Sequence, residues 1–252
     1  MNNEEKKKYY SIAFLVSLVL LINSIPFSLL ITNELLLFAI DLIIKTASIF
    51  YIIRYIKKDN LNKLKFTELK KGTIKLLPLS LLFMSNFIVI MFQQTPLNTT
   101  IDYFDIFTKI ILAIGVSVIE ELLFRGQIME EFLKKQKPVK AILYSSMIFG
   151  GVHLLNISSI GTIPTVLAQV GYTAFLGLIL GYIYYKSNNI IVPIAFHFLF
   201  NTFNDIIVTE LFSLKWDLTF FIVNISIGII VLLYILLSIK KEGTYASTNL
   251  DN

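Results

Sequence analysis

The stretch SIAFLVSLVLLINSIPFSLLI, residues 11–31, contains no charged side chain. About 20 apolar residues in a helix are needed to cross the ~30 Å hydrocarbon core of a bilayer, so this stretch is long enough to span a membrane. It follows three lysines, as a signal peptide would, but no pair of small residues forms a cleavage site at its end. We therefore predict a retained transmembrane anchor.

The same apolar character extends over most of the 252 residues. Hydrophobic residues make up 56% of the chain and charged residues 15%, against roughly 25% charged in soluble domains, so an ordinary soluble protein is excluded. Cys is absent, which removes disulfides, thiolate zinc sites and cysteine nucleophiles. We predict an all-α, polytopic membrane bundle of about eight transmembrane helices. The candidate spans are 11–31, 35–56, 76–92, 106–130, 139–156, 164–185, 190–212 and 217–239.

The charge pattern indicates an orientation in the membrane. A net charge of +5 could indicate a nucleic-acid partner, but most of the 22 Lys and Arg residues fall in alternate loops between the spans. Cytoplasmic loops carry such an excess of cations. We therefore predict a multi-pass protein of the cell (plasma) membrane with both termini cytoplasmic, the lipid bilayer as a partner and no bound nucleic acid.

We predict a single integral-membrane domain over 1–252, because no internal repeat is visible, with polar tails at 1–8 and 242–252. The segment 57–75 is too charged to cross the membrane, yet leucines and a phenylalanine are spaced among its lysines. We expect a cytoplasmic interfacial helix on anionic lipid, with a solvated basic loop as the alternative.

Several ionisable residues lie inside the predicted spans, where charge is costly and often functional. Asp41 and Lys45 are four residues apart and can neutralise each other. Glu121 and Arg125 can pair in the same way, whereas Glu120 is turned about 100° from Glu121 around the helix. The alternative is a charge cluster at a helix end whose long side chains reach the membrane surface.

Both histidines of the chain also fall inside predicted spans. Folding 106–130 and 139–156 into an antiparallel hairpin places Glu120 and His153 at one depth, since both lie equally far from the turn. His197 and Asn201 are four residues apart and share a helix face, which Asp205 continues. We expect these groups to converge in a cavity open to the cytoplasm.

Such a cavity suits the addition of water to a carbonyl group. Glu120 could take a proton from water with help from His153, while His197 and Asn201 donate hydrogen bonds to the developing oxyanion. This is peptide-bond hydrolysis with no metal required. The alternative is that Glu120, His153 and His197 hold a zinc ion with an open water position.

Three motifs, Glu-Glu-x-x-x-Arg at 120–125, Phe-x-x-x-His at 149–153 and His-x-x-x-Asn at 197–201, resemble those of the CPBP family of intramembrane proteases. The family includes type II CAAX prenyl endopeptidases and bacterial Abi proteins linked to bacteriocin self-immunity. The resemblance covers about 106–205, the predicted catalytic core. It implies an eight-helix bundle with a catalytic cavity that faces the cytoplasm, and the activity of an endopeptidase. The family has been described both as metalloproteases and as glutamic endopeptidases that need no metal. The catalytic residues that the resemblance implies are Glu120, His153, His197 and Asn201. We add Glu121 and Arg125 to the predicted catalytic site, because Arg125 would fix Glu121 and thereby the helix face that aims Glu120.

The substrate implied by the resemblance is a membrane-associated or lipidated peptide or protein, which includes prenylated chains, pheromones and bacteriocin precursors. Two other classes of protein stay open. A non-catalytic immunity or scaffold protein does not require this set of acid, imidazole and amide groups. A small transporter would be expected to show interrupted helices in two related halves, and the spans show none.

Overall fold

A computed structural model describes residues 3–59, 73, 76, 79, 84–157, 163–214 and 218–248. The described part is helical and contains no strand, only an isolated bridge between Leu97 and Phe212, so the all-α prediction is confirmed. The long helices are α1 (Asn3–Asn23), α2 (Glu34–Asp59), α3 (Ser85–Gln93), α4 (Tyr103–Leu123), α6 (Pro138–Val152), α7 (Ile163–Ser187), α8 (Ile191–Phe200) and α10 (Leu218–Thr248). Short segments extend them: η1 (Phe27–Leu29), η4 (Phe124–Met129), α5 (Glu130–Leu133), η5 (His153–Asn156), η7 (Asn201–Ile207) and α9 (Val208–Leu211).

Five helices in the described residues are long and apolar enough to cross a membrane. They run over Asn3–Leu29, Glu34–Lys57, Pro138–Asn156, Ile191–Leu211 and Leu218–Ile235. The predicted span 106–130 is helical, but its ionisable residues exclude it from this set. Most of the interfacial segment 57–75 lies outside the described residues, and within the predicted span 76–92 the structure describes the helix α3. The number of eight spans therefore stays a prediction.

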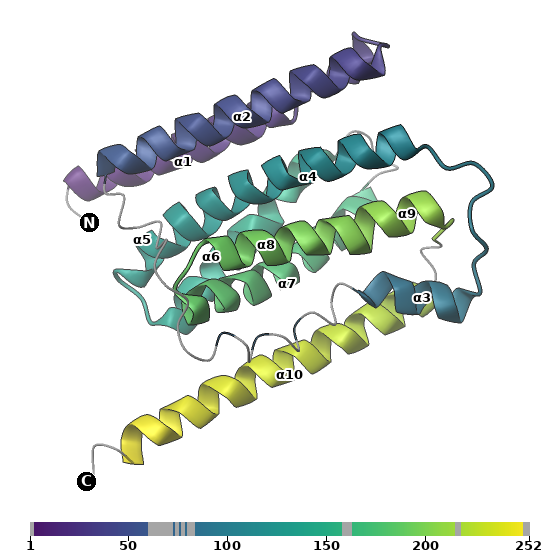
Figure 1. The fold of residues 1–252 in the computed structure, drawn as a ribbon. Coiled ribbons are helices and arrows are strands. Elements are labelled where there is room, and N and C mark those ends of the chain that lie inside the picture. Colours follow the sequence, from purple (N-terminus) through teal and green to yellow (C-terminus); the bar gives the residue numbers. More distant parts are fainter. Residues whose placement is uncertain are drawn as a thin grey trace. The chain divides into compact units, whose positions relative to one another are not determined.

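The chain divides into two compact units. The first comprises Met1–Lys70 and Tyr103–Phe198, and the second comprises Lys71–Asp102 and Leu199–Asn252. In the first unit α6 packs along α7, α2 packs on α4, and α1 packs on α2 (Figure 1). In the second unit α3 packs on α10 and on η7. The prediction of one domain over 1–252 stays a prediction.

Small residues bring α6 and α7 of the first unit into close contact. A Cβ added at Gly150 would lie 2.6 Å from the Cβ of Ala174 and 2.7 Å from the carbonyl oxygen of Val170, so only glycine allows this approach. Gly177 of α7 faces Phe149 and Ser146 in the same way. This packing fixes the end of α6, where His153 follows.

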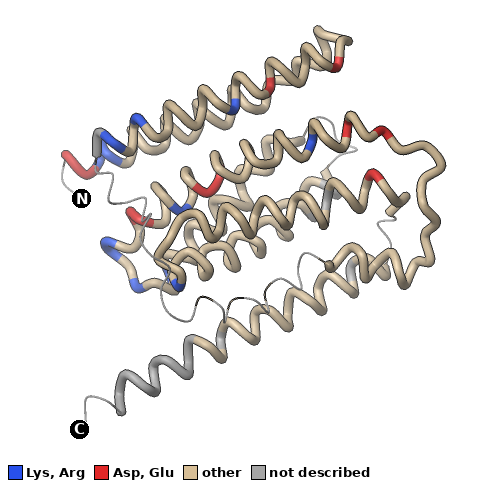
Figure 2. The backbone as a smooth tube through the Cα atoms, in the orientation of Figure 1, with Lys and Arg blue, Asp and Glu red and all other residues tan. Residues whose placement is uncertain are grey.

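Charged residues of the first unit gather where α1 begins and where α5 turns into α6 (Figure 2). Lys8 of α1 lies 2.9 Å from Glu131 of α5, and Lys135 lies 2.8 Å from Glu5. Pro138 occupies the first turn of α6, where its missing N–H costs no hydrogen bond. These ion pairs hold the start of α1 against the turn between α5 and α6.

Candidate active site

The helix formed by α4 and η4 carries a buried ion pair. Glu121 and Arg125 are both fully buried, and the Nη1 of Arg125 donates to the Oε1 of Glu121 at 2.8 Å, as the spacing predicts. The Nη2 of Arg125 donates to the carbonyl oxygen of Gly177 at 2.9 Å, which ties the pair to α7. Arg125 lies in the π-helical turn η4, a local widening often found at functional sites.

His197 of α8 connects the two carboxylates. Its Nδ1 lies 2.9 Å from the Oε1 of Glu121, and its Nε2 lies 3.6 Å from the Oε2 of Glu120. The Oε1 of Glu121 already accepts the hydrogen bond from Arg125, so the Nδ1 of His197 donates to the same oxygen and carries the proton. The Nε2 of His197 is therefore left facing Glu120.

Phe149 covers this ionic set with its ring. The guanidinium carbon of Arg125 lies 4.8 Å from the ring centroid, in cation–π distance. The ring also meets those of His153, His197 and Phe124 edge to face, with centroids 5.3, 6.0 and 4.9 Å apart. No function was predicted for Phe149 beyond its place in the Phe-x-x-x-His motif. The structure shows that it shields the ion pair, a role for which its position four residues before His153 was the available signal.

His153 begins η5, directly after α6. Its Nδ1 lies 2.9 Å from the carbonyl oxygen of Phe149. A carbonyl oxygen can only accept, so the Nδ1 of His153 donates and its Nε2 stays available. In both histidines the Nδ1 thus carries the proton, because it donates to an oxygen atom of the chain.

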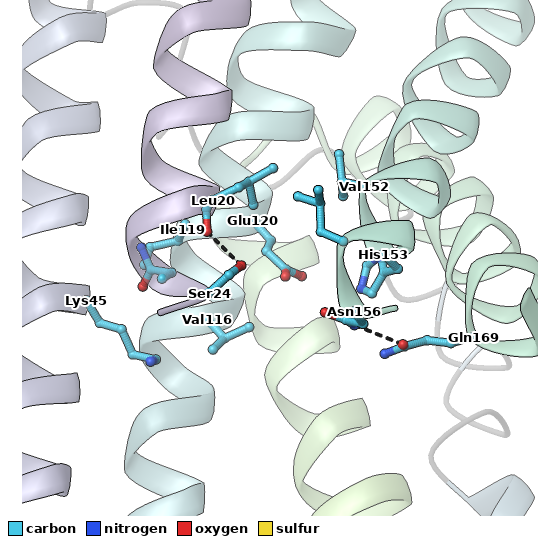
Figure 3. A pocket seen from close by; sticks show the side chains of 12 residues that line it. Leu20, Ser24, Lys45, Val116, Ile119, Glu120, Val152, His153, Asn156 and Gln169 are labelled. Atoms are coloured by element: carbon cyan, nitrogen blue, oxygen red, sulfur yellow. Dashed lines mark hydrogen bonds between the residues drawn. The ribbon is translucent and has the colours of Figure 1, made fainter. Parts of the chain in front are cut away.

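Glu120 and His153 line one cavity of about 210 Å³ in the first unit, as the hairpin geometry predicts (Figure 3). The side chain of Glu120 is 18% exposed, unlike the fully buried Glu121. The complete lining is Leu20, Asn23, Ser24, Lys45, Val116, Ile119, Glu120, Val152, His153, Leu155, Asn156 and Gln169.

The other predicted residues lie beyond α8. Asn201 is the first residue of η7 and belongs to the second unit, and Asp205 lies within η7. The structure thus brings Glu121, Arg125 and His197 into direct contact around Glu120, and joins Glu120 and His153 at one cavity. The proposed contribution of Asn201 stays a prediction.

The alternative of a zinc site can be tested on the donor atoms. Among the described residues, no three His, Asp or Glu side chains are grouped closely enough to hold one metal ion. A catalytic zinc site needs three protein ligands about 2.0–2.2 Å from the metal. The arrangement of Glu120, His153 and His197 in this structure does not fit such a site.

Comparison with known proteins identifies the part of the chain that carries this site. Residues 103–203 match the family model described as type II CAAX prenyl endopeptidase Rce1-like. No curated protein and no solved structure matches the chain. The matched stretch contains all three motifs, and together with the apolar helices it indicates a peptidase that passes the membrane several times. Residues 103–203 of this chain are thus similar to type II CAAX prenyl endopeptidases, in agreement with the resemblance of the three motifs.

Proposed function

We propose that the protein is an intramembrane endopeptidase in which Glu120 activates water without a metal ion. Its substrate is a membrane-associated or lipidated peptide or protein, with prenylated chains, pheromones and bacteriocin precursors as candidates. One observation carries the proposal. Glu120 is a partly exposed carboxylate that lines a polar cavity together with His153, and the Nε2 of His197 lies 3.6 Å from its Oε2.

The reaction follows from the roles these groups can take. Glu120 removes a proton from water, and the oxygen attacks the peptide carbonyl carbon to form a tetrahedral intermediate. The proton then passes from Glu120 to the leaving nitrogen as the carbon–nitrogen bond breaks. The Nε2 of His153 orients the water, and the Nε2 of His197, once it has taken a proton from solvent in the cavity, donates to the oxyanion. Asn201 supplies a further donor in this proposal.

Glu121 and Arg125 act as positioning residues. Arg125 holds Glu121, and Glu121 fixes the ring of His197, so both shape the surroundings of Glu120 without touching the substrate. We further propose that both termini are cytoplasmic and that the cavity opens to that side, as the loop charges indicate.

Cleavage of a quenched fluorescent lipopeptide by the purified protein in lipid nanodiscs tests the proposal. We expect Glu120→Gln to lower kcat/KM by roughly 100-fold to 10,000-fold, because a general base is lost. Glu34→Gln, the same change at an exposed carboxylate of α2, is the matched control and should have no effect. Full activity of Glu120→Gln would contradict the mechanism.

The same assay separates the remaining alternatives. A strong chelator should leave cleavage unchanged, whereas loss of activity that added zinc restores would establish the metalloprotease. Tight binding of the peptide without any cleavage by the wild type would favour an immunity or scaffold protein.

A further inference from the structure

Two amide side chains of the cavity lining are not used by the proposed reaction. Asn156 is the last residue of η5 and Gln169 lies on α7, and the Nδ2 of Asn156 donates to the Oε1 of Gln169 at 2.9 Å. Figure 3 shows the two side chains beside His153, joined by a dashed line. Both line the cavity that Glu120 and His153 also line. The amide pair therefore belongs to the same cavity as the reacting carboxylate.

The geometry of η5 aligns Asn156 with His153. A 3₁₀ helix has three residues per turn, so side chains three residues apart lie one above the other. His153 is the first residue of η5 and Asn156 is the last, which places Asn156 one turn, about 6 Å along the helix axis, beyond His153. A substrate chain that reaches His153 in this cavity therefore also passes the amide pair.

The position of Gln169 relative to η5 is fixed by the packing of α7 on α6. The backbone carbonyl of Gln169 accepts a hydrogen bond of 2.7 Å from the buried hydroxyl of Thr173. Val170, the next residue, lies with Ala174 against Gly150 of α6, where no larger side chain fits. Because α6 leads directly into η5, the two amides are held by helices that cannot easily shift against each other.

The pair leaves one acceptor and one donor without a partner in the part of the chain that the structure describes. The Oδ1 of Asn156 accepts no hydrogen bond there, and the Nε2 of Gln169 donates none. The donors of Asn23 and Ser24, which also line the cavity, are taken up by oxygen atoms of α1 and α2. Hydrogen bonds to a ligand are thus available on the side of the cavity that carries His153.

We propose that Asn156 and Gln169 bind the main chain of the substrate in an extended conformation. The Oδ1 of Asn156 accepts from a peptide N–H, and the Nε2 of Gln169 donates to a peptide carbonyl oxygen. This inference rests on the proposed endopeptidase function. One residue of an extended chain presents its N–H and its carbonyl group on the same side, which matches an acceptor beside a donor. Such main-chain hydrogen bonds give affinity without selecting a side chain, and they hold the scissile carbonyl group beside Glu120.

A series of lipopeptides, each with one backbone N–H other than that of the scissile bond replaced by an ester oxygen, tests this binding. In the wild type we expect one ester to lower kcat/KM roughly 5-fold to 30-fold, mainly through KM, because the Oδ1 of Asn156 loses its donor. The sensitive position should lie within about three residues of the scissile bond, since an extended chain advances about 3.3 Å per residue.

Asn156→Ala should lower kcat/KM for the all-amide peptide to about the level of the sensitive ester. It should also bring the ratio of kcat/KM between the amide and that ester close to one. Asn98→Ala is the matched control, because Asn98 makes amide hydrogen bonds to Glu210 and Ser213 in the second unit. This control should keep the wild-type ratio.

Binding measured without cleavage gives a second readout, in the Glu120→Gln background. The labelled amide peptide should bind roughly 5-fold to 30-fold more tightly than the sensitive ester, and Asn156→Ala should abolish that difference. Gln169→Glu keeps an acceptor for the Nδ2 of Asn156 but removes the donor to the substrate. It should therefore weaken binding of the amide peptide, and unchanged binding would overturn the role of Gln169.

Amides that only join η5 to α7 would give a different result. Asn156→Ala would then slow the amide and ester peptides by the same factor, which would overturn the proposal. A wild type that tolerates an ester at every position would overturn it as well. In both cases the proposed function would stand if Glu120→Gln still blocked cleavage, whereas cleavage that survives Glu120→Gln would remove the proposed function itself.

Discussion

The two units of the protein each bury a polar network, and the two networks are built differently. In the first unit the network is ionic: Glu121, Arg125 and His197 contact one another around Glu120. In the second unit it is neutral. It consists of amide and hydroxyl groups from α3, η7 and α10, namely Ser85, Asn86, Asn204 and Asn224.

The two networks also differ in how completely their atoms are paired. The Oε2 of Glu121 and the Nε of Arg125 are buried and have no hydrogen-bond partner within the described residues. In the neutral network, the Oδ1 of Asn204 accepts from the hydroxyl of Ser85 and from the backbone N–H of Asn86, both at 2.9 Å. Amide groups that bond to one another are typical of helix packing in membranes. A buried charge beside a cavity costs free energy and is typical of a functional site.

Breaking the ionic network should have the larger effect. Arg125→Met leaves the buried carboxylate of Glu121 without its partner, which typically costs about 3–5 kcal/mol. We expect a matching loss in the free energy of unfolding, measured by titrating a denaturing detergent into micelles. Lys109→Met at the exposed pair with Asp105 is the control and should cost at most about 1 kcal/mol.

Adding Glu121→Gln to Arg125→Met should recover part of the stability but not the cleavage, because His197 loses its orienting carboxylate. If Arg125→Met and Lys109→Met lower the free energy of unfolding by the same amount, the pair of Glu121 and Arg125 does not stabilise the fold as a buried ion pair.

Breaking the neutral network should cost less and leave the chemistry intact. Asn204→Ala removes one acceptor and leaves two buried donors, which we expect to cost about 1–3 kcal/mol in the same unfolding experiment. Cleavage per folded molecule should persist, because Asn204 is not part of the proposed reaction. A loss of cleavage without a loss of stability would show that the neutral network also serves the reaction.

Much of the ionic site could be predicted from the sequence because its spacings are local. The pairing of Glu121 with Arg125 depends only on the helical repeat, and the common cavity of Glu120 and His153 depends on one tight hairpin. The contact between His197 and Glu121 was not predicted. It joins helices 76 residues apart in the chain, and periodicity sets neither the rotation nor the register of one helix against another.

The fold, like the site, could be predicted where the signal lies within one segment and could not where it depends on packing between segments. Apolar run lengths predicted the helices α1, α2, α6, α7, α8 and α10, since length and hydropathy are properties of each segment alone. The neutral network was not predicted, because only the packing of α3, α10 and η7 brings Asn86 and Asn224 together. The π-helical turns at 124–129 and 201–207 were also missed, because an extra residue in a turn leaves no mark in the apolar pattern.

The smallest effect is expected at Glu131, a charged group of the first unit that lies beyond the predicted span. Burial alone would raise the pKa of Glu131, but hydrogen bonds from Lys134 and Lys8 outweigh it and hold the pKa below its ordinary value. A lowered pKa means that the folded state binds the proton less tightly than the unfolded state, so Glu131 stabilises the fold above the unfolded pKa. This stabilisation, at most about 1 kcal/mol, disappears as the pH falls through the folded pKa.

The free energy of unfolding of Glu131→Gln should therefore depend less on pH than that of the wild type below about pH 5. Glu34→Gln should keep the wild-type slope of this free energy against pH. Identical slopes for Glu131→Gln and the wild type would show that the contact between Lys8 and Glu131 does not help to hold the start of α1 against α5.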